Sequence, residues 1–246
     1  MALELRNPHS VLAALERRPR AVLEVRLAGA PHGAWRDVVR LSERQGVTVA
    51  RGVERREGRR EPKEGGGRAG SATALVRERD GVSLEELFAG AAERAGGRGV
   101  WLALDQIQDP HNVGAIFRTA AFFGIEGIVL LRDRAAPLNA TVYDIATGGV
   151  EVVPFSLQTN LSHALDQAKQ AGVWVLGSSE HAEQSVFEVS RDRPWLLVLG
   201  NEEKGMRRLT RERCDVVCSL PPRGGVTSLN VSVAAGVLMA ALTAER

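Results

Sequence analysis

The 246-residue sequence predicts an α/β fold, with a parallel sheet covered by helices and a smaller α/β unit before it. Helical and strand patterns alternate along most of the chain. The strands predicted in the second part are near-continuous apolar runs such as VWLAL and WLLVL, which is typical of parallel strands buried on both faces. Hydrophobic residues make up 44% of the chain, which is enough for a real core.

The first part of the chain predicts two amphipathic helices and three strands. The helices have apolar residues at helical spacing, and the strands alternate apolar and polar residues. A Gly- and Arg-rich stretch near 55–70 is too polar to bury and is expected to be a mobile loop. The helices are expected at 9–19 and 34–46, and the strands at 21–28, 47–53 and 71–79.

The second part alternates more regularly, as a parallel sheet requires. Helices are expected at 83–95, 112–124, 162–172 and 228–246, and strands begin at 99, 127, 173, 194 and 215. We therefore divide the chain into a smaller N-terminal domain at 1–79, a short linker at 80–84 and a larger second domain at 85–246.

Ligands of open parallel sheets bind beyond the carboxyl ends of the strands, so the loops after the strands are candidate sites. Four of these loops are rich in Gly, Asn, Ser or acidic residues. They are DQIQDPHNVGAIFR, GSSEH, GNEEKGM and PPRGGVTSLN.

Two of these loops leave alternatives open. Asn112 is expected to cap the helix that follows it, and Gly114 to admit another backbone. Arg118 lies on an otherwise apolar helix, so it binds either an anionic ligand or a carboxylate of the protein. Gly200 and Glu202 belong either to a simple tight turn or to a site in which Gly200 admits a ligand and Glu202 hydrogen-bonds a polar group.

Several functions are disfavoured by what the sequence lacks. It has no phosphate loop, no G-x-G-x-x-G after a strand and no metal-binding motif. Cys214 and Cys218 have no second pair of ligands and are expected to be reduced structural thiols. No signal peptide or membrane-spanning run is found, so a cytoplasmic protein without membrane or metal partners is expected.

The net charge is only +2, but arginines cluster at 51–70 and 204–213. Guanidinium groups suit phosphates, which indicates nucleic acid as a partner, although charge runs are often only solvated faces. The candidate nucleic-acid contacts are Arg207, Arg208, Arg211 and Arg223.

Three segments in this order, NVGAIFRTAAFFG, GNEEKGM and LPPRGGVTSLNVSVAAG, resemble the motifs of the TrmH-type (SpoU) branch of the SPOUT superfamily of RNA methyltransferases. Within it, the chain is most similar to bacterial enzymes that methylate the ribose of a guanosine in large-subunit ribosomal RNA. NPHSVLAALERRP resembles the start of the family's N-terminal domain, which is similar in fold to ribosomal proteins that bind kinked RNA.

The resemblance implies a deep trefoil knot, S-adenosyl-L-methionine as cofactor and an active homodimer. It also implies site residues by motif. The cofactor contacts would be Gly177, Leu199, Gly200, Leu220 and Leu229. The polar residues around donor and acceptor would be Asn112, Arg118, Glu202, Ser228 and Asn230.

Two departures from the family pattern are visible. Arg68-Ala69-Gly70 stands where many relatives have His-Gln-Gly, which leaves RNA contacts there open. Pro222 replaces a common methionine, a change expected to be tolerated in a loop governed by backbone geometry.

For methyl transfer to a ribose hydroxyl, Arg118 is expected to anchor phosphate and stabilise the developing alkoxide. A general-base role for Arg118 is the alternative. In the third motif, Ser228 is expected to cap the last helix, Asn230 to face the site and Ser232 to be a packing residue.

Three other functions remain as alternatives. A transfer RNA ribose methyltransferase of the same family fits the motifs equally well. A non-catalytic RNA-binding or ribosome-assembly protein would explain the arginines but not Asn112, Arg118 and Glu202 together. A nicotinamide oxidoreductase would explain only the α/β alternation.

Overall fold

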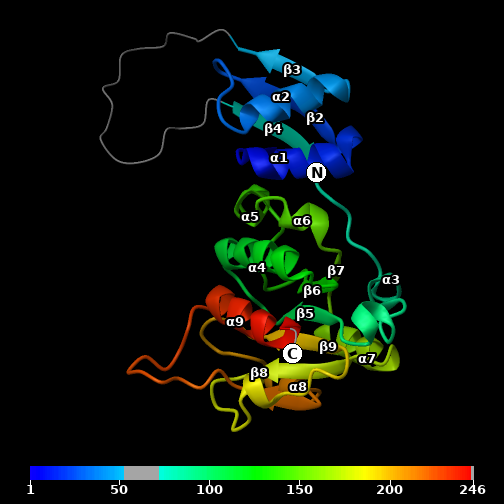
Figure 1. Ribbon diagram of the computed structural model, residues 1–246, viewed down its shortest axis with the longest axis vertical. Coiled ribbons are helices and arrows are strands. Elements are labelled where there is room, and N and C mark those ends of the chain that lie inside the picture. The colour runs from blue at the N-terminus through cyan, green and yellow to red at the C-terminus, as the bar shows by residue number, and fades with distance from the viewer. Residues whose placement is uncertain (53–71, 245–246) are drawn as a thin grey trace.

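The computed structural model describes residues 1–52 and 72–244 of the chain, and these residues form two sheets (Figure 1). The first sheet has four strands in the order β1-β4-β2-β3, and the second has six in the order β10-β8-β9-β5-β6-β7. All strand pairs of the second sheet are parallel. The predicted α/β class with a parallel sheet is therefore confirmed. The Gly/Arg-rich loop near 55–70, with Arg68-Ala69-Gly70, lies outside the described residues.

The first sheet and its two helices come from the start of the chain. Asn7 caps the first helix by accepting a hydrogen bond from the His9 N–H, and Pro8 occupies the first helical position. The elements are β1 (Ala2–Leu5), α1 (Pro8–Arg17), the 3₁₀ turn η1 (Pro19–Ala21), β2 (Val22–Leu27), α2 (Trp35–Arg44), β3 (Thr48–Arg51) and β4 (Ala72–Arg77).

The second sheet and its helices follow. Their elements are α3 (Leu84–Phe88), η2 (Arg94–Gly96), β5 (Val100–Leu104), α4 (Pro110–Phe123), β6 (Gly127–Leu131), α5 (Ala140–Ala146), α6 (Gly149–Val152), β7 (Phe155–Gln158), α7 (Leu161–Gln170), β8 (Trp174–Ser178), η3 (Val186–Glu188), β9 (Trp195–Leu199), α8 (Arg208–Arg211), β10 (Val216–Cys218) and α9 (Val231–Thr243).

The structure departs from the predicted elements in several places. The helix expected at 83–95 is only the five-residue α3 and a 3₁₀ turn, because Gly90 takes a positive φ of 65°. The short strand β1 is visible only through its antiparallel pairing with β4. The elements α5, α6 and β7 were not predicted, because each is seven residues or fewer and their order depends on packing.

Two expected helix caps are wrong. Helix α4 is capped by Asp109, whose carboxylate accepts from the His111 N–H, and Asn112 lies inside the helix instead. Helix α9 is capped by Asn230 and not by Ser228, since the Asn230 side chain accepts from the Ser232 N–H. In both helices the cap is the residue directly before the first helical residue. Its side-chain oxygen accepts from the backbone N–H two positions later, which has no partner within the helix.

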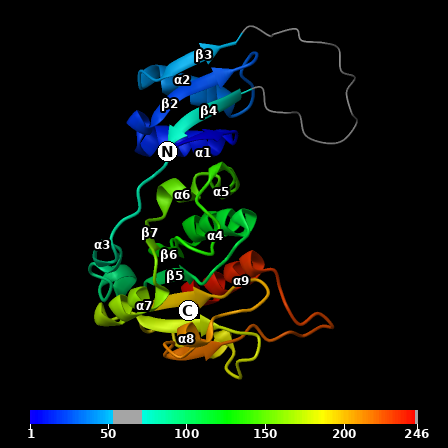
Figure 2. The same ribbon diagram turned by 180° about the vertical axis from the view of Figure 1, so that it is seen from behind.

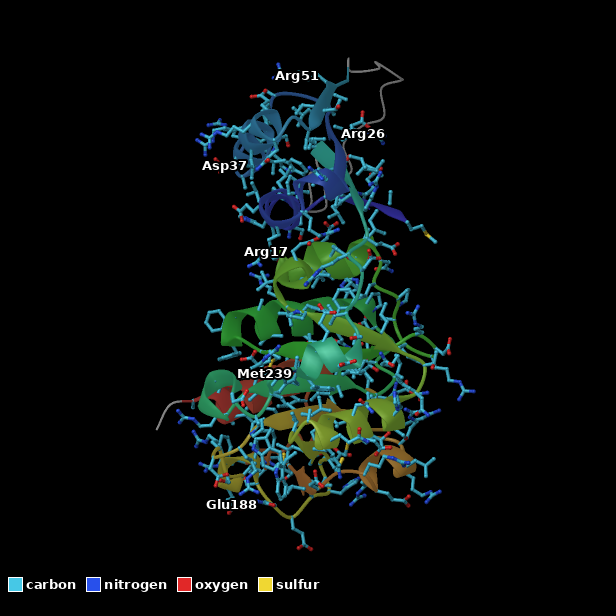
Figure 3. The ribbon with its side chains drawn as sticks, turned by 90° about the vertical axis from the view of Figure 1, so that its right-hand side faces the viewer. Arg17, Arg26, Asp37, Arg51, Glu188 and Met239 are labelled. Carbon is cyan, nitrogen blue, oxygen red and sulfur yellow. The ribbon has the colours of Figure 1, made fainter. Side chains whose placement is uncertain are left out.

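The parallel sheet is buried on both faces (Figures 1 and 2). Leu102 of β5 and Leu197 of β9 belong to the apolar cluster shared with α4 and α9, whereas Trp101 and Leu196 belong to the cluster shared with α3 and α7. Successive residues of a strand point to opposite faces, which explains why each strand is continuously apolar. Met239, labelled in Figure 3, is fully buried, as is Ala235, and both belong to the cluster shared by α4 and α9.

No helix among the described residues is long and apolar enough to cross a membrane.

Gly114 confirms the predicted close approach of another segment. A Cβ atom at this position of α4 would lie 2.7 Å from the Ile145 Cβ and 2.9 Å from the Val142 carbonyl oxygen, both of α5. Helices α4 and α5 can therefore touch only because residue 114 lacks a side chain.

We predict that Gly114→Ala lowers the free energy of unfolding by about 1–3 kcal/mol, because the methyl group overpacks the α4–α5 contact. Gly236→Ala in α9 is the matched control, since its Cβ would meet only Thr119 Cγ2 at 3.6 Å. The control should be neutral or stabilising by up to about 1 kcal/mol. Urea unfolding followed by circular dichroism measures both, and equal effects would contradict the packing explanation.

Candidate functional site

A cavity of about 580 Å³ lies at the carboxyl ends of β8, β9 and β10. Its volume is in the range of sites for small molecules and cofactors. The wall combines apolar side chains with backbone and polar groups from three loops and the start of α9. Predicted site residues in the wall are Leu199, Gly200, Glu202, Arg211, Leu220, Arg223, Ser228 and Leu229.

One side of this cavity is the loop from 221 to 230, in which every residue is exposed. It projects from the body of the protein before α9 begins (Figures 1 and 2). Two of its apolar side chains line the cavity and are largely open to solvent, Val226 at 75% and Leu229 at 54%. Exposed apolar groups beside a cavity favour contact with a ligand that has an apolar surface.

A chain of side-chain hydrogen bonds joins the three sequence motifs next to the cavity. The buried Asn112 of α4 donates from Nδ2 to Glu202 Oε1 at 3.1 Å and accepts at Oδ1 from Asn230 Nδ2 at 3.0 Å. Asn230 Oδ1 in turn accepts from the Ser232 hydroxyl at 2.6 Å. Ser232, expected to be only a packing residue, is therefore part of the polar chain.

Glu202 is held by the protein itself. Besides Asn112, its carboxylate accepts from Asn201 Nδ2 at 3.2 Å and, at 3.4 Å each, from the backbone N–H groups of Gln108 and Asp109. These donors come from the loop after β5 and from the loop after β9. Glu202 thus fixes the two loops together, and protein donors occupy all of the roughly four acceptor positions of its carboxylate.

Gly200 is required by the turn that follows it. A Cβ atom there would lie 2.2 Å from the backbone nitrogen of Met206, and Asn201 pairs with Gly205 through two backbone hydrogen bonds. The sequence left open whether Gly200 serves a tight turn or admits a ligand. The tight turn explains why a glycine is needed, and Gly200 also lines the cavity. Gly177 does not line the cavity; it lies against the side chains of Met206 and Cys214.

Arg118 is not brought to the cavity within one chain. It lies six residues after Asn112, which places it about 9 Å farther along α4 and about 240° around the helix. Its side chain is exposed, and among the described residues it makes no hydrogen bond or ion pair. The internal salt bridge that was one alternative is therefore not formed in the part of the chain that the structure describes. Arg118 instead lines a shallow hollow with Thr119, Ala121 and Phe122.

The arginines predicted to contact RNA have different surroundings. Arg207 is committed to the fully buried Asp105, with Nε 2.7 Å from Oδ1 and the backbone N–H 3.0 Å from Oδ2. Arg208 pairs with Glu212 on the surface of α8. Arg211 and Arg223 are exposed at the cavity wall and are available to an anionic ligand.

Two residues of the site, Asp105 and Asn201, were not among the predicted ones. Asp105 ends β5 and binds Arg207, while Asn201 donates to the Gln106 carbonyl oxygen at 2.8 Å. Both tie the loop after β9 to the end of β5. A polar residue directly after an apolar strand was the available signal for Asp105.

The two cysteines are free, as expected, and burial keeps them protonated. Loss of solvation raises the pKa of Cys214 to about 11 and that of Cys218 to about 12. Within the described residues, no group of three or more His, Cys, Asp or Glu side chains could hold a metal ion.

The model described as the SpoU rRNA Methylase family matches residues 99–240. The 23S rRNA (guanosine-2'-O-)-methyltransferase RlmB of Pseudomonas aeruginosa is 45% identical over 163 residues, which are 66% of this chain and 64% of that protein. This match thus spans slightly less than two thirds of that relative. RlmB of Yersinia pestis is 36% identical over 239 residues, 97% of this chain and 95% of that protein.

Among solved structures, the SpoU methyltransferase AviRb from Streptomyces viridochromogenes in complex with the cofactor AdoMet has a similar fold. The TM-score is 0.78 at 20% sequence identity, covering 98% of this chain and 89% of that chain.

We predict that Asp105→Asn lowers the free energy of unfolding by about 1–3 kcal/mol, because it leaves Arg207 without its buried partner. Glu212→Gln, which breaks the exposed pair with Arg208, should change it by less than about 0.5 kcal/mol. Denaturant unfolding measures both values. If the two variants were equally stable, the Asp105–Arg207 pair would not hold the loop.

Proposed function

Because the chain belongs to the SpoU rRNA methylase family, we propose that it methylates a ribose 2′-hydroxyl in RNA, with S-adenosyl-L-methionine as methyl donor. The target is a guanosine of large-subunit (23S) ribosomal RNA, the substrate class in the names of the RlmB relatives. The observation that carries the proposal is the cavity at the carboxyl edge of the sheet, bordered by a hydrogen-bond chain through all three family motifs.

The cavity residues suit this cofactor. Leu199, Leu220 and Leu229 offer apolar surface to a nucleoside, and the backbone around Gly200 offers polar groups. When bound, the cofactor supplies a methyl group already activated on a sulfonium. Glu202 and Asn230 hold the polar side of the site, and Ser228 lies at the cavity wall within the exposed loop.

Arg118 acts in this proposal on the RNA, by binding phosphate and stabilising the oxyanion that forms as the hydroxyl loses its proton. Its exposed side chain, without a partner among the described residues, leaves the guanidinium free for this task. Because Arg118 lies away from the cavity of its own chain, it completes the site of a second copy.

The proposal includes a homodimer through α4 and α9, and exposed apolar residues on these helices support it. Phe122 of α4 is 82% exposed and Val233 of α9 is 52% exposed, and the two helices pack on each other near Thr119 and Gly236. Exposed apolar side chains on two helices that pack together favour burial by an identical surface.

The proposal also includes the finer features of the family. The last part of the chain forms a deep trefoil knot. Support comes from α9, which follows the edge strand β10 but packs on α4 and β5 near the middle of the sheet.

Residues 1–79 form the RNA-binding domain, similar in fold to ribosomal proteins that bind kinked RNA, and 85–246 the catalytic domain. The enzyme works in the cytoplasm, where ribosomal RNA is modified.

We predict that the protein binds S-adenosyl-L-methionine with micromolar affinity and does not bind NAD, since the cavity has no dinucleotide fingerprint. Isothermal titration calorimetry tests this. With radiolabelled cofactor, the label should enter large-subunit ribosomal RNA, and mapping of ribose methylation should locate it on a guanosine. Labelling of transfer RNA instead would show that the substrate is transfer RNA. Cofactor binding without methyl transfer to any RNA would contradict an enzymatic role.

We predict that Arg118→Lys lowers kcat by about a hundredfold while cofactor affinity is unchanged, because lysine lacks the planar fork of donors. Glu202→Gln should lower both kcat and cofactor affinity, because it also loosens the two loops that Glu202 joins beside the cavity. Arg98→Lys is the control, because Arg98 is exposed and lies before the amino end of β5, at the opposite edge of the sheet from the cavity. Near-normal turnover of Arg118→Lys would remove the guanidinium from the chemistry.

A further inference from the structure

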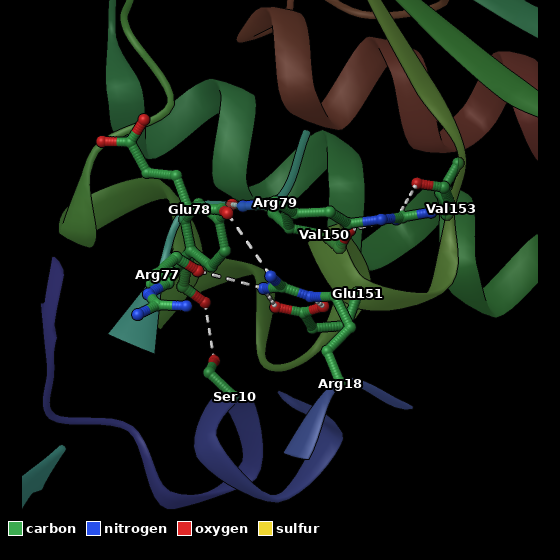
Figure 4. Close-up of polar contacts among 9 residues, drawn as sticks. Ser10, Arg18, Arg77, Glu78, Arg79, Val150, Glu151 and Val153 are labelled. Carbon is green, nitrogen blue, oxygen red and sulfur yellow. Dashed lines mark hydrogen bonds and ion pairs between the residues drawn. The ribbon is translucent and has the colours of Figure 1, made fainter. Parts of the chain in front are cut away.

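Arg18 is the centre of the contact between the first sheet and the rest of the protein (Figure 4). It follows α1 and forms a two-pronged ion pair with Glu151 of α6, with Nε 2.7 Å from Oε2 and Nη2 2.6 Å from Oε1. The Glu151 side chain is 1% exposed. The same guanidinium donates to the carbonyl oxygens of Arg77 and Glu78, so it also fixes the chain that leaves β4.

Arg79 makes a second connection beside the first. Its guanidinium donates to the carbonyl oxygens of Val150 and Val153 and lies 5.6 Å from the centre of the Phe155 ring. Its backbone N–H donates to the Tyr143 hydroxyl at 2.9 Å. Loss of solvation lowers the pKa of Arg79, which agrees with its enclosed position. The segment between the two sheets is therefore held close to its start.

The start of α1 is tied to α5 as well. The Asp144 carboxylate accepts from the backbone N–H groups of Arg6 and Asn7 at 3.0 and 2.9 Å, and the Ser10 hydroxyl donates to the Tyr143 carbonyl oxygen at 2.6 Å. A Cβ atom on Gly148, whose φ is 92°, would lie 2.9 Å from the Ala13 Cβ. Helix α1 thus lies close against the α5–α6 turn.

Apolar packing completes this contact. Val11, Ala14 and Leu15 of α1 are fully buried, and they belong to the same apolar cluster as Val142 and Val150. Arg17, the last residue of α1, is labelled in Figure 3 next to the boundary between the two parts. Contacts between domains of one chain are usually smaller and more polar than this one, and they allow relative motion. Such motion is not expected of a continuous apolar core with an enclosed ion pair.

We propose that this junction, made by Arg18, Arg79, Asp144 and Glu151, holds the N-terminal sheet in one orientation and thereby determines which RNA is accepted. The inference rests on the proposed function. With the N-terminal sheet and the cavity held at a fixed distance, the protein binds a folded RNA in which the target loop and a second structured element are the same distance apart. A loosely tethered N-terminal part would accept RNAs of many spacings. Buried ion pairs add little stability, but they can fix a unique arrangement.

The orientation itself is tested by electron–electron double resonance between spin labels at Glu43→Cys in the first part and Gln170→Cys in the second. Both positions are exposed, whereas the buried native cysteines, with raised pKa values, react slowly. Dilution with unlabelled protein isolates distances within one chain. We expect one narrow distance distribution, which should broaden in Glu151→Gln and in Ala13→Glu, a wedge against Gly148. A broad distribution in the otherwise unchanged protein would overturn the proposal.

Selectivity is tested with two ribosomal RNA fragments, one natural and one whose helix next to the target loop is longer by about three base pairs. We expect the unaltered protein to lose at least about tenfold in kcat/KM on the longer RNA. Glu151→Gln and Ala13→Glu should lose less than about threefold. Asp37→Asn, which breaks an exposed pair with Arg40 inside α2, is the control and should behave like the unaltered protein.

Equal discrimination by the unaltered protein and the junction variants would overturn the selectivity. Cofactor binding by each variant shows that the second part is folded, and the wedge variant serves where loss of the ion pair prevents folding. Absence of methyl transfer by the unaltered protein to the natural RNA would contradict the proposed function instead, while the distance measurement would still test the junction.

Discussion

The candidate site depends on the side-chain amide of Asn112. This amide is buried, so both of its ends must be satisfied, and leaving either one unpaired would cost about 1–3 kcal/mol. Glu202 accepts from one end and Asn230 donates to the other. One residue therefore joins α4, the loop after β9 and the start of α9. The cavity keeps its shape because three segments distant in sequence share these bonds.

The loop from 221 to 230 is anchored mainly at its far end by this arrangement. Asn230 caps α9 and reaches Asn112, whereas the residues before it are exposed. Such a loop keeps its exit fixed and its body free to adjust to a ligand. The exposed Val226 and Leu229 are then the apolar surface that a nucleoside would cover.

Arginines of the same chemical type have opposite roles in this protein. Arg18 and Arg207 are bound to the buried carboxylates of Glu151 and Asp105, where they fix one part of the chain to another. Arg118, Arg211 and Arg223 remain exposed and are available for phosphate. Neighbouring residues in the sequence do not distinguish the two groups, because the carboxylates lie about a hundred positions away or more.

The sequence by itself determined the α/β class, most of the longer helices and strands, and the loops in which the cavity lies. Apolar periodicity is a local property, and parallel strands bring their following loops to one edge. The family resemblance also selected Asn112, Glu202 and Asn230, whose side chains the fold joins by hydrogen bonds.

Only the tertiary structure decided the caps of α4 and α9, the partner of each arginine and the short elements α5, α6 and β7. It also showed that Gly200 is needed by the backbone at Met206, and it placed Arg118 away from its own cavity. These features depend on atoms that meet only after folding. A hydrogen bond or a close contact has a direction and a distance, and neither is encoded by spacing along the chain.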